Sequence, residues 1–79
     1  MILNEIRQVV EMKINKGGNF ITKKSFKKSK HTSDTFRQLE VLGYIMKHEL
    51  DIYKINCKIP QMSSYKLRKL YDEKIKANK

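Results

Sequence analysis

Five lysines crowd the segment KKSFKKSK, and no acid stands among them. A lysine ammonium group is a compact positive charge with three N–H donors, which suits the oxygens of a polyanion. The chain has 18 Lys and Arg against 8 Asp and Glu, a formal charge of +10 on 79 residues. Such a field speeds encounters with polyanions. Composition therefore favours nucleic acid as the partner, ahead of an acidic membrane surface or an acidic protein.

The other chemistry-bearing residues form no catalytic or metal-binding pattern. Cys57 is the only cysteine, so an internal disulfide is excluded, and with His31 and His48 it lacks the spacing of a zinc site. No glycine-rich phosphate loop and no nucleophile pattern is found. We expect a protein that is not an enzyme, with no catalytic residue, no metal and no cofactor. The lone cysteine favours a cytoplasmic location. No apolar run approaches the roughly 18 residues that cross a bilayer, and we expect no membrane partner.

The length suits one small domain over residues 1–79, close to the size at which a core needs help from a partner subunit. Apolar residues at helical spacing predict a first helix over residues 2–15, which Gly17-Gly18 then ends. They are Ile2, Leu3, Ile6, Val9, Val10 and Ile14. Residues 19–21 should be extended.

Two further helices are expected, the first of them over most of the lysine-rich segment. Thr22 can cap a second helix over 23–29, with Phe26 as its apolar anchor. Lys30-His31 would then form a turn. Thr32 or Ser33 would cap a third helix that runs to Leu42 and stops at Gly43, with Phe36, Leu39 and Leu42 on one side.

After Gly43 the apolar period changes from that of a helix to that of a strand. Residues 53–59 alternate apolar and polar side chains, which predicts a half-buried strand with Cys57 on its buried face, ended by Pro60. Residues 44–47 are its expected hairpin partner, with a turn around 48–51. Ser63 or Ser64 can cap a last helix to about Lys76.

The apolar seam of this last helix has three readings: packing on its own domain, pairing with a second copy, or lying on a membrane surface. We favour pairing. The seam residues are Leu67, Leu70, Tyr71 and Ile75.

Phe36, Leu39 and the closing sequence Leu42-Gly43-Tyr44-Ile45 resemble the recognition helix of the winged helix-turn-helix family, which passes into the first strand of the wing. The resemblance covers about residues 2–59. It implies an α+β, mainly helical fold with three N-terminal helices and a short β-hairpin wing. The chain adds a C-terminal helix over 61–77, which looks like those through which small dimeric members pair. Phe26 and Phe36 are a few residues closer than is usual in that family, so the second helix or the turn must be abbreviated.

The resemblance implies that the third helix enters the major groove of double-stranded DNA. Base readout would then come from Ser33, Thr35, Arg37 and Gln38. Arginine can contact guanine and glutamine adenine. Phosphate contacts would come from Lys23, Lys24, Lys27, Lys28, Lys30 and Thr32. Wing contacts would come from Lys47 and His48, with Lys54 nearby. Asp34 is read as a helix-end charge rather than as a base contact.

Three functions remain open on these residues. The first is a sequence-specific DNA-binding protein acting as a homodimer in transcription regulation, of a size that suits a phage, virus or plasmid product. The second is a plasmid or phage segregation adaptor that binds centromere repeats and recruits a filament protein. The third is a basic module that binds an acidic protein, for instance a polymerase subunit.

Overall fold

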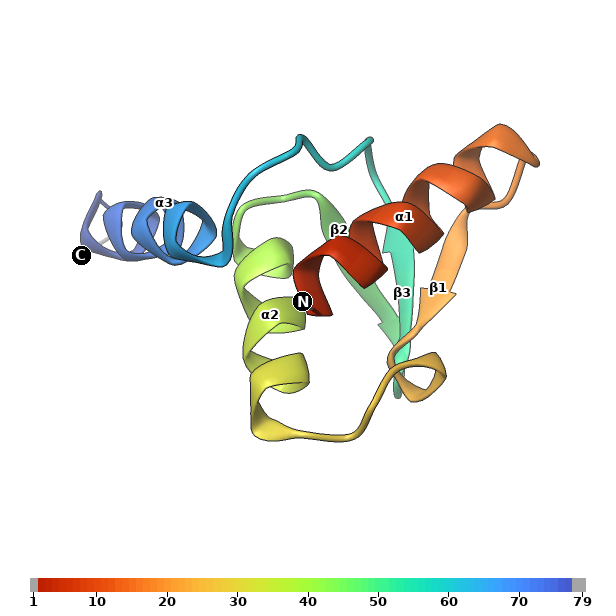
Figure 1. Ribbon diagram of the computed structural model, residues 1–79, viewed down its shortest axis with the longest axis horizontal. Coiled ribbons are helices and arrows are strands. Elements are labelled where there is room, and N and C mark those ends of the chain that lie inside the picture. Colours follow the sequence, from red (N-terminus) through yellow and green to blue (C-terminus); the bar gives the residue numbers. More distant parts are fainter. Residues whose placement is uncertain (1, 78–79) are drawn as a thin grey trace.

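The computed structural model describes residues 2–77, which form three α-helices and a three-stranded antiparallel sheet (Figure 1). This α+β, mainly helical architecture confirms the coarse fold class predicted from the sequence, whereas the winged helix-turn-helix assignment stays a prediction. The elements are α1 (Ile2–Asn15), β1 (Phe20–Thr22), the single 3₁₀ turn η1 (Lys23–Ser25), α2 (Lys30–Val41), β2 (Ile45–Glu49), β3 (Ile52–Ile55) and α3 (Ser64–Ala77).

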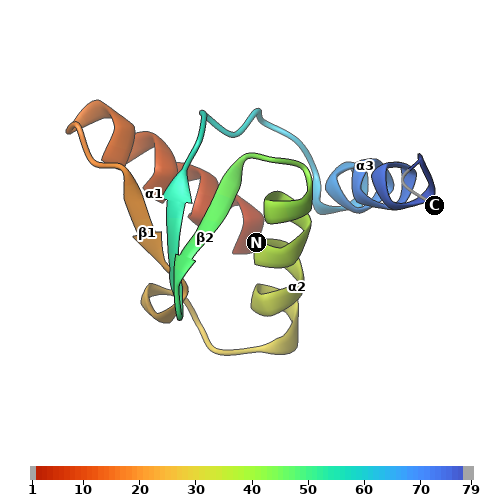
Figure 2. The ribbon, with the colours of Figure 1, turned by 180° about the vertical axis from the view of Figure 1, so that it is seen from behind.

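The sheet has the order β1-β3-β2, so the first strand pairs with the last one. Phe20, Lys54 and Met46 lie in one row across the three strands. Helix α1 covers one face of the sheet, and the view from behind shows the opposite face in front of α1 (Figures 1 and 2). Helix α2 packs against α1 and β2, while α3 contacts α2 and projects away from the rest of the molecule.

Helix α1 has the predicted bounds. Its first three turns bury Ile2, Leu3, Ile6 and Val10, whereas Ile14 is exposed, contrary to the predicted stripe. Ile14 belongs to the last turn, which lies at the margin of the molecule beyond the core (Figure 1). The helix ends as expected: Gly17 has φ +80° and the Gly18 N–H donates to the Lys13 carbonyl at 2.6 Å.

The predicted second helix over 23–29 is wrong. Only η1 forms, capped by the Thr22 hydroxyl, which accepts from the Lys24 N–H at 3.1 Å. At Phe26 the backbone is extended, and its ring lies 5.6 Å from that of Phe36. The short spacing between these two phenylalanines therefore abbreviates the second helix, as the sequence required.

Helix α2 begins earlier than predicted and ends where expected. Ser29 is its N-cap, so the predicted turn at Lys30-His31 and the predicted cap at Thr32 or Ser33 are wrong. At the other end Gly43 has φ +87° and the Tyr44 N–H donates to the Leu39 carbonyl at 3.1 Å. The positive φ explains the glycine, because other residues rarely adopt it.

The predicted hairpin is present, but its second strand is shorter than the alternation suggested. Strand β3 ends at Ile55, and Cys57 is exposed rather than buried. The chain leaves the sheet at Asn56, whose side-chain amide donates to the Gly43 carbonyl at 3.1 Å. Beyond the sheet, the two-residue period no longer dictates which side chain faces the core.

Phe36 lies at the centre of the core and is fully buried. Its ring centroid lies 5.6 Å from that of Phe26 and 5.0 Å from that of Tyr53. These aromatic pairs join α2 to the basic segment and to β3. The buried apolar residues also include Ile21, Leu39, Ile45, Ile55, Ile59 and Leu67.

Measurements at alkaline pH should reveal how the protonated Tyr53 hydroxyl contributes to the free energy of unfolding. Burial raises the pKa of the Tyr53 hydroxyl above 10.0, and the charges of Glu40 and Asp51 raise it further. A raised pKa means that the folded state favours the protonated phenol, so this stabilisation is complete below pH 10 and is lost as pH rises through the folded pKa. In denaturant titrations, Tyr53→Phe should lose less stability than wild type above pH 10. The exposed Tyr65 offers the control Tyr65→Phe, which should follow wild type.

Candidate nucleic-acid interface

The exposed face of α2 lies opposite its buried stripe. Lys30, Ser33, Asp34 and Arg37 are exposed, while Phe36 and Leu39 on the other side are fully buried. No ion pair ties Arg37 to an acid within residues 2–77. Among the predicted base-reading residues, Ser33 and Arg37 therefore stand free on the surface.

Two threonines predicted to contact DNA face the core instead. Thr32 is 2% exposed and its hydroxyl donates to the Lys27 carbonyl at 2.6 Å. Thr35 is 4% exposed and its hydroxyl donates to the His31 carbonyl at 2.9 Å. Both hydroxyl protons are used within the chain. The assignment of Thr32 to phosphate and of Thr35 to base readout is therefore wrong in this structure.

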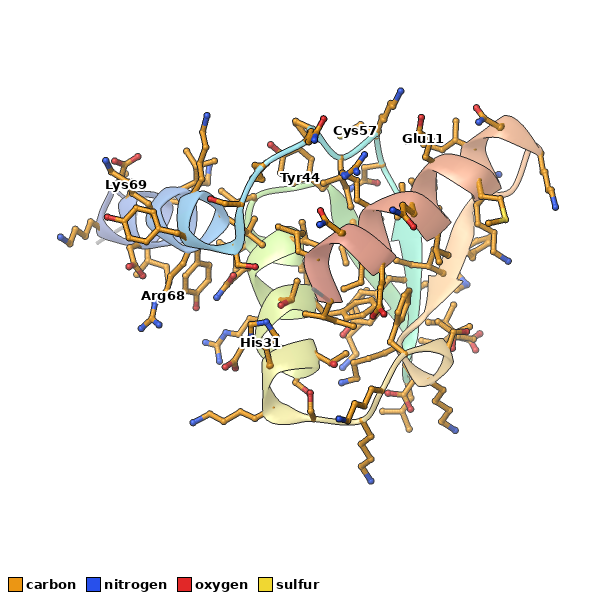
Figure 3. All side chains as sticks on the ribbon, in the orientation of Figure 1. Glu11, His31, Tyr44, Cys57, Arg68 and Lys69 are labelled. Atoms are coloured by element: carbon orange, nitrogen blue, oxygen red, sulfur yellow. The ribbon has the colours of Figure 1, made fainter. Side chains whose placement is uncertain are left out.

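Gln38 lies in a recess between α2 and α3 and is only half exposed. The recess has a volume of about 290 Å³, and its lining includes His31, Tyr65 and Arg68. Figure 3 shows His31 of α2 and Arg68 of α3 on the same side of the molecule. A second recess of about 300 Å³ brings Arg37 near Tyr71 and Asp72 of α3. Helix α3 thus borders the face of α2 that carries Gln38.

A hollow of about 390 Å³ opens between η1 and the start of α2. We call it the lysine hollow; its lining residues are Lys23, Lys24, Phe26, Lys27, Lys28, Ser29, Thr32, Ser33 and Asp51. Four of the five clustered lysines border it, and Lys30 follows directly in the first turn of α2. The structure thus brings the predicted phosphate-binding lysines together beside the exposed end of α2.

Asp51 is the acid that the lysine run lacks in sequence. It lies in the hairpin turn with φ 65°, a left-handed conformation that aspartate tolerates. Its carboxylate oxygens lie 3.8 Å from Lys23 Nζ and 3.9 Å from Lys24 Nζ. Its carbonyl accepts from the Lys23 N–H at 2.7 Å. The hairpin turn is therefore fastened to η1 through Asp51.

The predicted wing residues Lys47 and His48 are exposed on β2. The His48 ring lies 5.0 Å from that of Phe20 and is tilted to it, so it packs against a side chain of the edge strand β1. Lys54 is exposed on the central strand, level with Phe20 and Met46. These side chains are all free to meet a ligand, but they do not line the lysine hollow.

The seam of α3 is divided between core and surface. Leu67 is 1% exposed and belongs to the core of its own chain, so the prediction that it contacts a second copy is wrong. It is the first inward residue of α3, where the helix still touches α2. Leu70, Tyr71 and Ile75 remain partly exposed further along α3. Pairing through these three stays a prediction.

Sequence reasoning missed Ser29, Asp51 and Arg68. Ser29 is a favoured cap residue, and this signal was present but competed with Thr32 and Ser33. Because the hairpin turn has no glycine, an aspartate there was a candidate for a left-handed backbone conformation. Nothing in the local sequence showed that its carboxylate lies among the lysines. Nothing in the local sequence linked Arg68 to α2.

Comparison of the chain with protein-family models, with curated protein sequences and with solved structures finds no match. Residues 2–77 hold no group of three or more His, Cys, Asp and Glu side chains placed to share a metal ion. Within the same residues, no helix combines the length and apolar character that a membrane crossing needs.

The N-cap of α2 can be tested by a matched pair of serines. Ser29→Ala removes the hydroxyl that accepts from the Thr32 N–H at 3.1 Å, and should lower the free energy of unfolding by about 1 kcal/mol. Ser33→Ala, on the exposed face, should change it by less than about 0.5 kcal/mol. Urea titration measures both; equal losses would contradict the capping assignment.

Proposed function

We propose that the chain is a sequence-specific double-stranded DNA-binding protein of the winged helix-turn-helix type. The observation that carries this proposal is the adjacency of two surfaces. The exposed face of α2 presents Lys30 and Ser33 in its N-terminal half and Arg37 one turn further on, and the lysine hollow opens beside the start of the helix. One surface offers hydrogen-bond donors to base edges, and the other offers charge to phosphates.

The order of the elements supports the same proposal. A helix, a strand, a helical turn, a second helix and a hairpin follow one another as the resemblance implies. Strand β1 pairs with β3, and the hairpin turn reaches the lysine hollow through Asp51. The departure is the reduction of the middle helix to η1, so the element that directly precedes α2 is a single helical turn rather than a full helix.

The dimensions of DNA indicate how α2 would dock. An α-helix with its side chains is about 10–12 Å wide, and the major groove is about 12 Å wide, so α2 would fill the groove. Helix α3 borders the Gln38 side of α2. It also lies near Arg37. In helix-turn-helix docking the N-terminal residues of the helix contact base edges, so Lys30 and Ser33 would enter the groove first, with Arg37 one turn behind them.

The proposal extends to a homodimer that pairs through α3 beyond Leu67. The helix projects from the domain, and Leu70, Tyr71 and Ile75 are partly exposed on it (Figures 1 and 2). Pairing would cover these side chains. It would also place two α2 helices on one duplex, with half-sites about 10 base pairs apart.

Two substitutions separate base readout from phosphate binding. Arg37→Ala should relax the preferred base at one position and cost about 1–3 kcal/mol on the selected site. Lys27→Ala should weaken selected and unrelated duplexes alike and reduce the salt slope by about one. The assay is selection of bound duplexes from a random pool, followed by titration at several salt concentrations.

Lys69→Ala on the exposed face of α3 is the matched control for removing one charge, and should change binding less than Lys27→Ala. If Arg37→Ala leaves both affinity and preference unchanged, α2 is not the reading helix. Retention of an acidic protein, with no duplex bound at low salt, would replace this proposal by a protein-binding module. Enrichment of direct repeats would point to a segregation adaptor.

The oligomeric state tests the α3 proposal separately. Ile75→Glu should shift a dimer toward monomer in sedimentation experiments, because burying a lone carboxylate in an apolar interface is costly. The matched variant Glu73→Gln, on the exposed face of the same helix, should leave the dimer intact. A wild-type chain that stays monomeric at high concentration would contradict pairing.

A further inference from the structure

Asp51 is held in the lysine hollow by its backbone as well as by its charge. Its carbonyl accepts from the Lys23 N–H at 2.7 Å, and its left-handed φ of 65° closes the hairpin turn. The carboxylate is about three-quarters buried, with an exposed fraction of 23%. The acid is therefore a fixed part of the hollow rather than a mobile surface charge.

The carboxylate forms ion pairs with two lysine ammonium groups that an entering phosphate would otherwise contact. Lys23 Nζ lies 3.8 Å and Lys24 Nζ 3.9 Å from its two oxygens, so both lysines share one acid. Lys27 and Lys28 border the same hollow without an ion pair in the described part of the chain. A phosphate group entering the hollow meets four ammonium groups and one carboxylate, and that carboxylate repels it.

We propose that Asp51 is a built-in competitor for backbone phosphates. It holds Lys23 and Lys24 in the free protein and must release them when a phosphate enters the hollow. Asp51 therefore weakens binding to every duplex alike and leaves base preference to α2. This inference rests on the proposed function, because it names the regulation of the phosphate contacts.

Asp51→Asn tests the proposal with the fold preserved, because asparagine also adopts the left-handed conformation. The variant should bind selected and random-sequence duplexes roughly threefold to tenfold more tightly at low salt, as expected for one charge removed near several phosphates. Its salt dependence should be steeper by about one phosphate contact. The preferred sequence should not change.

Glu49→Gln is the matched control. Glu49 is an exposed acid on the same hairpin, outside the lysine hollow, and its removal changes net charge equally. It should alter affinity by less than about twofold, because exposed charges are well screened. Adding Lys23→Gln and Lys24→Gln to Asp51→Asn should erase the gain, since the released lysines cause it. Thermal melting shows whether each variant is folded.

A second arm uses inorganic tripolyphosphate and needs no DNA. In an NMR titration, the amides of Lys24, Lys28 and Ser33 should shift, and at lower tripolyphosphate concentration in Asp51→Asn than in wild type. If the amides shift as expected while neither wild type nor Asp51→Asn binds a duplex, the proposed function is contradicted. Competition between Asp51 and a phosphate group in the lysine hollow is then still supported. If Asp51→Asn binds duplex and tripolyphosphate no better than Glu49→Gln, or binds them less well, competition by Asp51 is overturned. The same conclusion follows if tripolyphosphate shifts no amide of the hollow.

Discussion

Burial of Phe36 is the constraint on which the rest of the structure depends. Its ring meets Phe26 of the basic segment and Tyr53 of β3, with no exposed surface of its own. A buried phenylalanine is worth about 3–5 kcal/mol relative to alanine, a large part of the about 5–15 kcal/mol that stabilises a typical domain. Because this side of α2 is fixed inward, Arg37 on the next position is presented outward.

The same contact explains why the basic segment is not a helix. Phe26 must reach Phe36 within ten residues, and a regular helix followed by a turn would use too much of that chain. The segment therefore breaks at Phe26 and restarts at Ser29, the cap of α2. The lysines that a helix would spread around its axis instead border one hollow. The positions of the charges are thus a consequence of the core.

The spacing of apolar residues predicted the elements that pack through an apolar face. The bounds of α1, the stop at Gly43 and the existence of the hairpin followed from spacing and from glycine alone. The start of α2 did not, because Ser29, Thr32 and Ser33 are all good caps and only the tertiary position of Phe26 decides among them. The inward placement of Thr32 and Thr35 was within reach, since they share helical spacing with Phe36 and Leu39.

Ion pairs between residues far apart along the chain could not be predicted from the sequence. The lysine run showed where positive charge gathers, but the register of β1 with β3 decides that the turn after β2 meets η1. That register brings the carboxylate of Asp51 to two lysines and leaves Lys27, Lys28 and Lys30 outside the described ion pairs. The backbone pairing that places Asp51 beside Lys23 and Lys24 therefore lowers the net positive charge of this surface. Under the proposed function, a polyanion would be drawn by the whole field, and the acid that the sheet places in the lysine hollow would oppose it. The fold, as well as the number of lysines, would then set the binding strength at this surface.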